Sequence, residues 1–413
     1  MELLAPAGNF TKMKYALEYG ADSIYLGLPD FSLRARINDF TPQKLIKAIE
    51  YAHQRHKKIY ITVNVYAHNR HLNKIEKSLK FLNKLKPDGV IISDPGVLIM
   101  AKKYLKNIDL HLSTQANTTN WQSAKFWYEQ GIKRIILARE LSIKEIAVIH
   151  KKVPKLELES FVHGAMCMSY SGRCLLSAWF NQRSANLGDC SHPCRWDYNV
   201  FIEEQQRPGV YVPIEEDSHG TYILSSKDLC MIKYLDKLAN AGVKHFKIEG
   251  RTKSISYLAN VVKIYRQAVD TYELRIPTNI RMKQINKLYK ELNKISNREF
   301  TTGFYFGGEK MPMQKYDAPY VRPDLEFIGE VLKVKKLKNG KYQAQLKVHN
   351  VIKMGEKVEV IVPQGDNFKI RLPELYDLDK KDYVVEAHGG QNKMVLLNLD
   401  KEIPLFSILR KKI

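Results

Sequence analysis

The 413-residue chain lacks the sequence features that mark several large protein classes. It contains no run of eighteen apolar residues, so we expect no membrane-spanning helix and no membrane partner. No Gly-x-Gly-x-x-Gly follows a predicted strand, which argues against a dinucleotide-binding fold. His-Glu-x-x-His and Gly-x-Ser-x-Gly are absent as well. The commonest patterns of zinc peptidases and serine hydrolases are therefore missing.

An export signal is also lacking at the start of the sequence. The first residues, Met-Glu-Leu-Leu-Ala-Pro, contain no basic segment followed by an apolar one. We therefore expect a cytoplasmic protein whose thiols stay reduced. In that compartment, clustered cysteines indicate a metal site or a catalytic site instead of disulfides.

Cysteine is scarce, and all five cysteines fall within one short stretch. They are Cys167, Cys174, Cys190, Cys194 and Cys230. The stretch has no Cys-x-x-Cys pair of the kind that structural zinc sites use. Wide spacing suits ligands that come from separate loops, as an iron–sulfur cluster tolerates. A zinc site and a set of ordinary buried cysteines stay open as alternatives.

Acidic residues are fewer than basic residues. The chain has 66 Lys+Arg against 44 Asp+Glu, a formal net charge of +22. This excess favours a polyanionic partner, which is most often nucleic acid. A lysine-rich proteome would produce the same excess without any function.

Short apolar runs alternate with helical patterns through the first 310 residues. This alternation predicts an α/β domain, a TIM-like (β/α)8 barrel, over residues 1–310. A doubly wound open sheet is the alternative fold. The predicted strands span residues 2–5, 23–27, 58–64, 88–94, 109–115, 134–139, 156–163 and 244–249.

Polar residues stand at the carboxyl ends of the predicted strands, where a barrel of this type builds its active site. Asn64, Ser93 and Gln115 are examples. We predict five catalytic side chains at these ends: Arg139, Glu140, His163, Glu249 and Arg251.

A cysteine-rich insert at residues 164–235 joins the seventh and eighth strands, so we expect it over the same end of the barrel. Within it, residues 196–204 and 209–214 predict a hairpin. Ser225 to Asp228 predict a helix start whose dipole would favour the Cys230 thiolate.

The remaining chain predicts a second, smaller domain. Phe300–Gly308 has the composition of a linker, and we place the linker itself at 311–324. Short strands then predict a small β-barrel over 325–413, with a hairpin at Asn339-Gly340. Its basic residues suit RNA phosphate contacts, although an ordinary solvated strand surface is the alternative. They are Lys333, Lys335, Lys336, Lys338, Lys341, Arg410, Lys411 and Lys412.

The cysteine stretch also carries a family resemblance. Glu159 to Ser177, E-S-F-V-H-G-A-M-C-M-S-Y-S-G-R-C-L-L-S, resembles the signature of the peptidase U32 family. The segments G-D-C-S-H-P-C-R-W, S-S-K-D-L-C, F-K-I-E-G-R and N-R-E-F-T-T-G-F-Y-F-G resemble the same family. The resemblance covers essentially the whole chain. Within the family it is strongest to the prephenate-dependent tRNA uridine 5-hydroxylation proteins.

The resemblance implies a cofactor and partners. It implies a [4Fe-4S] cluster on Cys167, Cys174, Cys190 and Cys230, which leaves Cys194 over. It further implies tRNA as substrate, prephenate as co-substrate and a 5-hydroxyl on a wobble uridine as the product. A paralogous protein is a further candidate partner.

Prephenate is a dicarboxylate, so its site needs cations in bidentate geometry. The candidates are Arg139, Arg173 and Arg251, of which Arg173 and Arg251 are our predicted ligand-binding pair.

Other functions compete with this one. The family also includes collagenase-like peptidases, for which Cys167 with His163 or Cys194 with His192 would supply a Cys–His dyad. A cysteine committed to a cluster is unavailable as a nucleophile. A related protein acting on ribosomal RNA and a non-catalytic RNA-binding protein are further alternatives.

Overall fold

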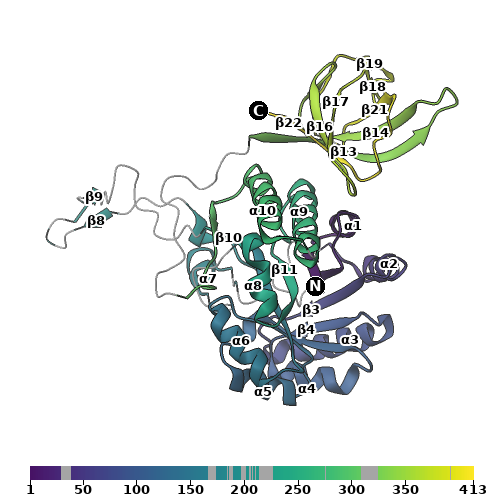
Figure 1. Ribbon diagram of the computed structural model, residues 1–413. Helices are drawn as coiled ribbons and strands as arrows, with labels where there is room; N and C mark the ends of the chain where they lie inside the picture. The colour runs from purple at the N-terminus through teal and green to yellow at the C-terminus, as the bar shows by residue number, and fades with distance from the viewer. Residues whose placement is uncertain are drawn as a thin grey trace.

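A computed structural model describes residues 1–28, 39–165, 174–183, 185, 189–196, 201–203, 206, 208–209, 211–213, 227–274, 276–307, 324–390 and 392–413. Eight parallel strands in the order β11-β1-β2-β3-β4-β5-β6-β7 close into a barrel, because β11 also pairs with β7 (Figure 1). The TIM-like prediction is therefore confirmed, and the open sheet is wrong. The strands are β1 (Glu2–Pro6), β2 (Ser23–Gly27), β3 (Lys58–Val63), β4 (Gly89–Ile92), β5 (Asp109–Leu112), β6 (Arg134–Ile136), β7 (Glu157–Ala165) and β11 (Val243–Ile248).

Helices cover the outside of this barrel (Figure 1). Several begin at a side-chain cap: Asn9, Asp94 and Ser142 each accept a hydrogen bond from the backbone N–H three residues later. The cap at Asp94 explains why β4 is shorter than predicted, since the residue starts a helix instead of ending a strand. The helices are α1 (Phe10–Glu18), α2 (Pro42–His53), α3 (Asn69–Leu85), α4 (Pro95–Tyr104), α5 (Trp121–Glu129), α6 (Ile143–Lys152), α8 (Leu235–Asn240), α9 (Ile255–Glu273) and α10 (Thr278–Asn293).

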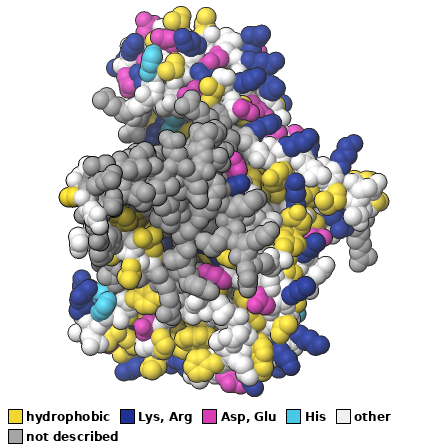
Figure 2. Space-filling model, turned by 90° about the vertical axis from the view of Figure 1, so that its left-hand side faces the viewer, with side chains coloured by type: hydrophobic (Ala, Val, Ile, Leu, Met, Phe, Trp, Pro, Cys, Tyr) yellow, Lys and Arg dark blue, Asp and Glu magenta, His cyan; other side chains and the backbone are white. Residues whose placement is uncertain are grey.

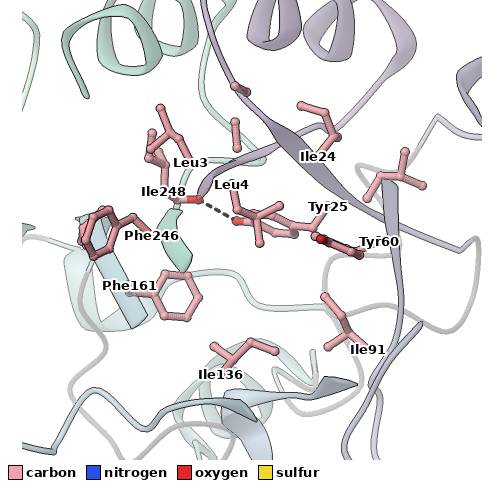
Figure 3. Packing of buried hydrophobic residues seen from close by; sticks show 14 of the residues in the cluster. Leu3, Leu4, Ile24, Tyr25, Tyr60, Ile91, Ile136, Phe161, Phe246 and Ile248 are labelled. Carbon is pink, nitrogen blue, oxygen red and sulfur yellow. Dashed lines mark hydrogen bonds between the residues drawn. The ribbon is translucent and has the colours of Figure 1, made fainter. Parts of the chain in front are cut away.

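The barrel interior is packed by side chains from the strands (Figure 3). Tyr25 reaches across it, and its hydroxyl donates to the Ile248 carbonyl at 3.0 Å. Leu4, Ile91 and Phe161 are buried around this ring. The interior is therefore filled, as in other barrels of this size, and is not an open pore.

The cysteine-rich insert is described in part. It contains α7 (Leu176–Asn181) and a hairpin of β8 (Phe201–Glu203) with β9 (Tyr211–Pro213), which confirms the predicted pairing. Next comes β10 (Asp228–Cys230), which pairs antiparallel with β7, while β12 (Phe300–Thr301) pairs with β10. The helix start predicted at Asp228 is wrong, because this segment extends the sheet beside the barrel.

The segment after α10 is also not the linker that its composition predicted. Besides β12, it contributes Tyr305, which is 3% exposed and donates its hydroxyl to the Phe161 carbonyl at 2.6 Å. The predicted linker at 311–324 lies outside the described residues except for Asp324.

The second domain is an antiparallel sheet that curls into a half-barrel (Figure 1). The strand order is β17-β16-β22-β13-β14-β21-β18-β19, and a short pair, β15–β20, stands beside it. The predicted turn at Asn339-Gly340 is confirmed between β13 and β14, with Gly340 at φ 82°. The strands are β13 (Leu325–Lys336), β14 (Tyr342–Val348), β15 (Ile352–Lys353), β16 (Lys357–Ile361), β17 (Phe368–Arg371), β18 (Leu375–Asp377), β19 (Asp382–Val384), β20 (Glu386–Ala387), β21 (Met394–Leu399) and β22 (Ile408–Lys412).

The half-barrel is docked on α1 and α9. The Tyr19 hydroxyl donates to the carbonyls of Ile361, at 2.8 Å, and Phe406, at 3.0 Å. Ile361 and Ile408 belong to the same buried apolar cluster as the barrel.

Basic side chains are numerous on the half-barrel at the top of Figure 2. Within the described part of the chain, no helix has the length and apolar character needed to cross a membrane.

Candidate active site at the carboxyl ends of the barrel strands

An oriented ion pair stands at the carboxyl ends of β6 and β11, which we call the mouth of the barrel. Arg139 Nη2 lies 3.3 Å from Glu249 Oε2, and both side chains are mostly buried, at 11% and 14% exposed. The guanidinium also lies over the Phe161 ring, 3.9 Å from its centroid. Stacking and pairing together hold the arginine in one orientation.

One donor of this arginine is left over. Arg139 Nε is buried and makes no hydrogen bond within the described residues. A buried donor without a partner is costly, and an anionic ligand at the mouth would satisfy it.

The other predicted cation of the mouth, Arg251, follows β11 and is 5% exposed. Glu140 directly follows Arg139. Tyr305 lies close to Arg139 and Glu140. Burial raises the pKa of its hydroxyl, and the charge of Glu140 adds to the rise. Arg173 lies outside the described residues. The structure thus gathers Arg139, Glu140, Glu249 and Arg251 on the β6 and β11 ends. It adds Tyr305, which sequence reasoning missed although it belongs to the quoted N-R-E-F-T-T-G-F-Y-F-G segment.

The predicted catalytic His163 has different surroundings. It is 2% exposed and packs against the rings of Tyr257, Tyr265 and Phe300. Its Nδ1 lies 3.3 Å from the Tyr265 hydroxyl. Burial, together with the charge of Lys253, lowers its pKa to about 3. His163 is therefore neutral at neutral pH.

Polar side chains also line the ends of β3 and β5. Asn64 Nδ2 donates to Ser113 Oγ at 3.0 Å, and Ser93 Oγ donates to the Asn64 carbonyl at 3.2 Å. The side-chain oxygens of Asn64 and Gln115 are buried and accept no hydrogen bond within the described chain. These strand ends are therefore polar, as the sequence predicted.

Three of the cysteines belong to insert segments that side-chain bonds tie together. Ser177 Oγ accepts the Ser191 backbone N–H at 2.9 Å and lies 3.3 Å from the Asp189 carbonyl. This joins the chain just after Cys174 to the chain that flanks Cys190 and precedes Cys194. The His192 backbone N–H also donates to Cys190 Sγ at 3.4 Å.

Cys230 differs from the other described cysteines because its side chain is buried. It ends β10, is 5% exposed, and its Sγ lies 3.6 Å from the Tyr265 hydroxyl. Burial raises the pKa of its thiol to about 11, although a hydrogen bond from the backbone N–H of Ile232, where a short 3-10 helix begins, acts in the opposite direction. A metal would have to displace the thiol proton.

The thiol set has the donor chemistry of an iron–sulfur cluster, which is held by cysteine thiolates. No disulfide joins Cys174, Cys190, Cys194 or Cys230. Cys167 lies outside the described residues. Among those that are described, no three His, Cys, Asp or Glu side chains are arranged to hold a metal ion.

The opposite end of the barrel carries a second charged cluster. Arg134 contacts Glu157 at 2.9 Å, Glu2 at 3.3 Å and Glu159 at 3.4 Å. Lys247 Nζ bonds Glu159 at 2.7 Å, and Glu159 is fully buried. Lys247 is the last but one residue of β11, and its Nζ lies 4.2 Å from the Tyr25 ring centroid and 5.5 Å from that of Phe161. The Glu159–Lys247 pair therefore lies inside the barrel, between the Arg134 cluster and the mouth.

Comparison with known proteins fits this two-domain architecture. The sequence profile of peptidase family U32 matches residues 8–315, and that of the peptidase family U32 C-terminal domain matches residues 323–410. The chain belongs to peptidase family U32. The first match covers the barrel except β1, including its mouth, and the second covers nearly all of the half-barrel.

Individual relatives of this chain have names that refer to different activities. The tRNA hydroxylation protein P of Haemophilus influenzae is 38% identical over 98% of this chain and 94% of its own length. The protein of that name from Escherichia coli is 39% identical over 89% of this chain and 88% of its own. A protein named collagenase from Porphyromonas gingivalis is 32% identical over 74% of this chain and 73% of its own.

Proposed function

We propose that this U32 protein is a tRNA-hydroxylating enzyme that installs a 5-hydroxyl on a wobble uridine, with prephenate as co-substrate. The carrying observation is the end-to-end similarity to relatives named tRNA hydroxylation protein P, which includes both domains. The net charge of +22 supports a polyanionic substrate.

The mouth supplies groups suited to a dicarboxylate. Arg139 is fixed by Glu249 and Phe161, and its Nε is a buried donor without a partner in the described chain. Arg251, also buried, follows the same strand as Glu249. Two buried guanidinium groups would bind two carboxylates and exclude water from them.

We further propose that Cys167, Cys174, Cys190 and Cys230 hold a [4Fe-4S] cluster. The support is the donor chemistry and the tie between the Cys174 and Cys190 segments through Ser177. When bound, such a cluster would supply one-electron chemistry. The role of the chain is to orient the four thiolates and to keep Cys230 out of water.

The function is tested by complementation. In a bacterial strain that lacks its own enzyme, the wild-type protein should restore hydroxyuridine-type nucleosides, measured by mass spectrometry of tRNA digests. Arg251→Ala and Cys174→Ser should abolish restoration while the proteins are still expressed and folded. An Arg251→Ala protein with full activity would contradict the proposed anion site.

Metal content is tested separately. Anaerobically purified protein should contain iron and sulfide and absorb as a cluster protein. Stoichiometric zinc without iron would overturn the cluster. Loss of iron in Cys194→Ser with retention in Cys190→Ser would replace Cys190 by Cys194 in the ligand set.

A peptidase is the second candidate, favoured by the relative named collagenase. It expects purified protein to cleave denatured collagen or casein and to lose that activity in Cys194→Ser. Robust proteolysis with no change in tRNA nucleosides would establish this candidate over the first.

A further inference from the structure

A groove runs between the barrel and the half-barrel. It consists of two adjoining clefts of about 480 and 380 Å³, both lined by Lys294, Leu325 and Arg410. One end is formed by the outer face of β16, β17 and β22. The other end is formed by Lys253, with Ser254 and Tyr257 at the start of α9. The groove therefore leads from the half-barrel to the loop of Arg251 at the mouth.

The strand register places cations side by side at the half-barrel end. Lys357 of β16 stands directly opposite Arg371 of β17, so both side chains point to the same face. Arg371 lies just beyond the residues that line the cleft, and its Nη1 donates to the Gly355 carbonyl at 3.1 Å, which leaves its other N–H groups for a ligand. Lys412 lies two residues beyond Arg410, which pairs with Glu359 on that face. Like charges directly opposite one another destabilise a sheet. An anion bound between them would offset this repulsion.

The basic side chains of the groove fall into two groups. Arg410 contacts Glu359 at 2.9 Å and Glu291 of α10 at 3.3 Å, so it joins the two domains. Lys357, Lys369 and Lys412 are exposed and make no ion pair in the described part of the chain. Their charges are therefore available to a ligand.

Few acidic side chains line the cleft of about 480 Å³ beside these lysines. The acidic residues that line this cleft are Asp324 and Glu359, and Arg410 already pairs with Glu359. Adjacent strands lie about 4.8 Å apart, so the row Lys412, Lys357 and Arg371 spans roughly 10 Å. An extended polyanion fits a row of this length better than a single small anion does.

We propose that this groove binds the sugar–phosphate backbone of the RNA substrate and leads the strand to the mouth. The inference rests on the proposed function, since it names the surface that holds the tRNA. Lys357, Arg371 and Lys412 contact phosphates, and contacts of this kind position an RNA without reading its sequence.

The test uses the full-length protein and an unmodified tRNA transcript. The triple variant Lys357→Gln, Arg371→Gln and Lys412→Gln removes the row. A charge-matched control, Lys144→Gln, Lys151→Gln and Lys155→Gln, removes three exposed lysines on and just after α6, far from the half-barrel (Figure 1). Dissociation constants are measured from 50 to 300 mM salt.

The groove variant should bind tRNA about ten-fold or more weakly at 100 mM salt, with a salt slope shallower by about 2 to 3. The control should stay within about two-fold of wild type. The substitutions relieve repulsion and remove one exposed hydrogen bond, from Arg371 to the Gly355 carbonyl, so the groove variant should melt close to wild type. Equal affinity and slope in the two variants would overturn the groove. Failure of wild-type protein itself to bind tRNA or to restore the modified nucleoside would instead overturn the proposed function.

Discussion

At the scale of single residues, two charged clusters of one barrel use the same side-chain types differently. Inside the barrel, Lys247 and Arg134 bond the fully buried carboxylate of Glu159. At the mouth, Arg139 pairs with Glu249 and keeps Nε without a partner in the described chain. In the first cluster the buried carboxylate of Glu159 has its hydrogen-bond partners, and the cluster stabilises the fold. In the second, the Nε–H of Arg139 can donate a hydrogen bond to a ligand.

Lys247→Met should therefore be strongly destabilising. It leaves the Glu159 carboxylate buried with only the longer Arg134 contact, and breaking a buried pair costs about 3–5 kcal/mol. Urea unfolding at pH 7 measures the loss. The control is Lys244→Met, an exposed position on the same strand, which should change stability by less than about 0.5 kcal/mol. An equal loss of unfolding free energy in the two variants would show that the buried Lys247–Glu159 pair does not stabilise the protein.

The same cluster predicts a pH dependence. Hydrogen bonding from His245, followed by the charge of Arg134, lowers the pKa of Glu157 to about 2. The folded pKa lies below the unfolded value near 4.5. The stability from Glu157 is thus present above pH 4.5 and is lost as the pH falls toward 2. In Glu157→Gln, the free energy of unfolding should fall less steeply over this window in urea titrations. An unchanged slope would contradict the assignment.

At the scale of elements, the mouth depends on how β7 ends beside β11. Gly164 there has φ +104°, and a Cβ at this position would lie 2.6 Å from the Glu249 carbonyl oxygen. Glu249 in turn donates its backbone N–H to the His163 carbonyl at 2.8 Å. The glycine thus allows the two strands to approach where Glu249 must meet Arg139.

Gly164→Ala should destabilise the protein and displace Glu249, which reduces tRNA modification. The control is Gly131→Ala, where φ is +87° but no atom lies within 4 Å of the added Cβ. Both variants carry backbone strain of about 1–3 kcal/mol, so the difference between them reports the clash at Glu249. Thermal unfolding and nucleoside analysis measure the two effects. Activity lost equally in both variants would assign it to strain alone.

At the scale of the whole molecule, a buried lysine joins the two domains. Lys263 of α9 is 6% exposed and donates from Nζ to the carbonyls of Val362, at 2.7 Å, and Gly365, at 3.0 Å. Burial lowers its pKa to about 8. Because Ile361 and Ile408 complete the barrel's apolar cluster, removing the half-barrel would expose this core. Point variants therefore test RNA binding more cleanly than truncation does.

Lys263→Met should loosen the half-barrel without unfolding the barrel. The substitution leaves two carbonyls without their donor, at a cost of about 1–3 kcal/mol each. Limited proteolysis should cleave between the domains faster than in wild type, and urea unfolding should become less cooperative. Lys287→Met, an exposed position in the neighbouring cleft, should leave both measurements unchanged. Unaltered proteolysis in Lys263→Met would show that apolar contacts alone hold the domains together.

The sequence by itself determined the elements of this protein. Apolar runs and caps such as Asn9 and Ser142 are local signals, and so is the Asn339-Gly340 turn. The strand count and the barrel class followed, because eight strand–helix units of this length have few ways to pack. The quoted segments around Glu159 to Ser177 also identified the family.

Only the tertiary structure decided which residues meet. Glu159 and Glu249 are both polar residues of barrel strands in sequence, yet Glu159 bonds Lys247 inside the barrel whereas Glu249 pairs with Arg139 at the mouth. Cys230 ends a strand instead of starting a helix, and Tyr305 is buried beside Phe161 although its segment has linker composition. The row that Lys357, Arg371 and Lys412 form depends on the pairing of three strands. Strand register, burial and charge partners arise from contacts between distant segments, and local periodicity does not encode them.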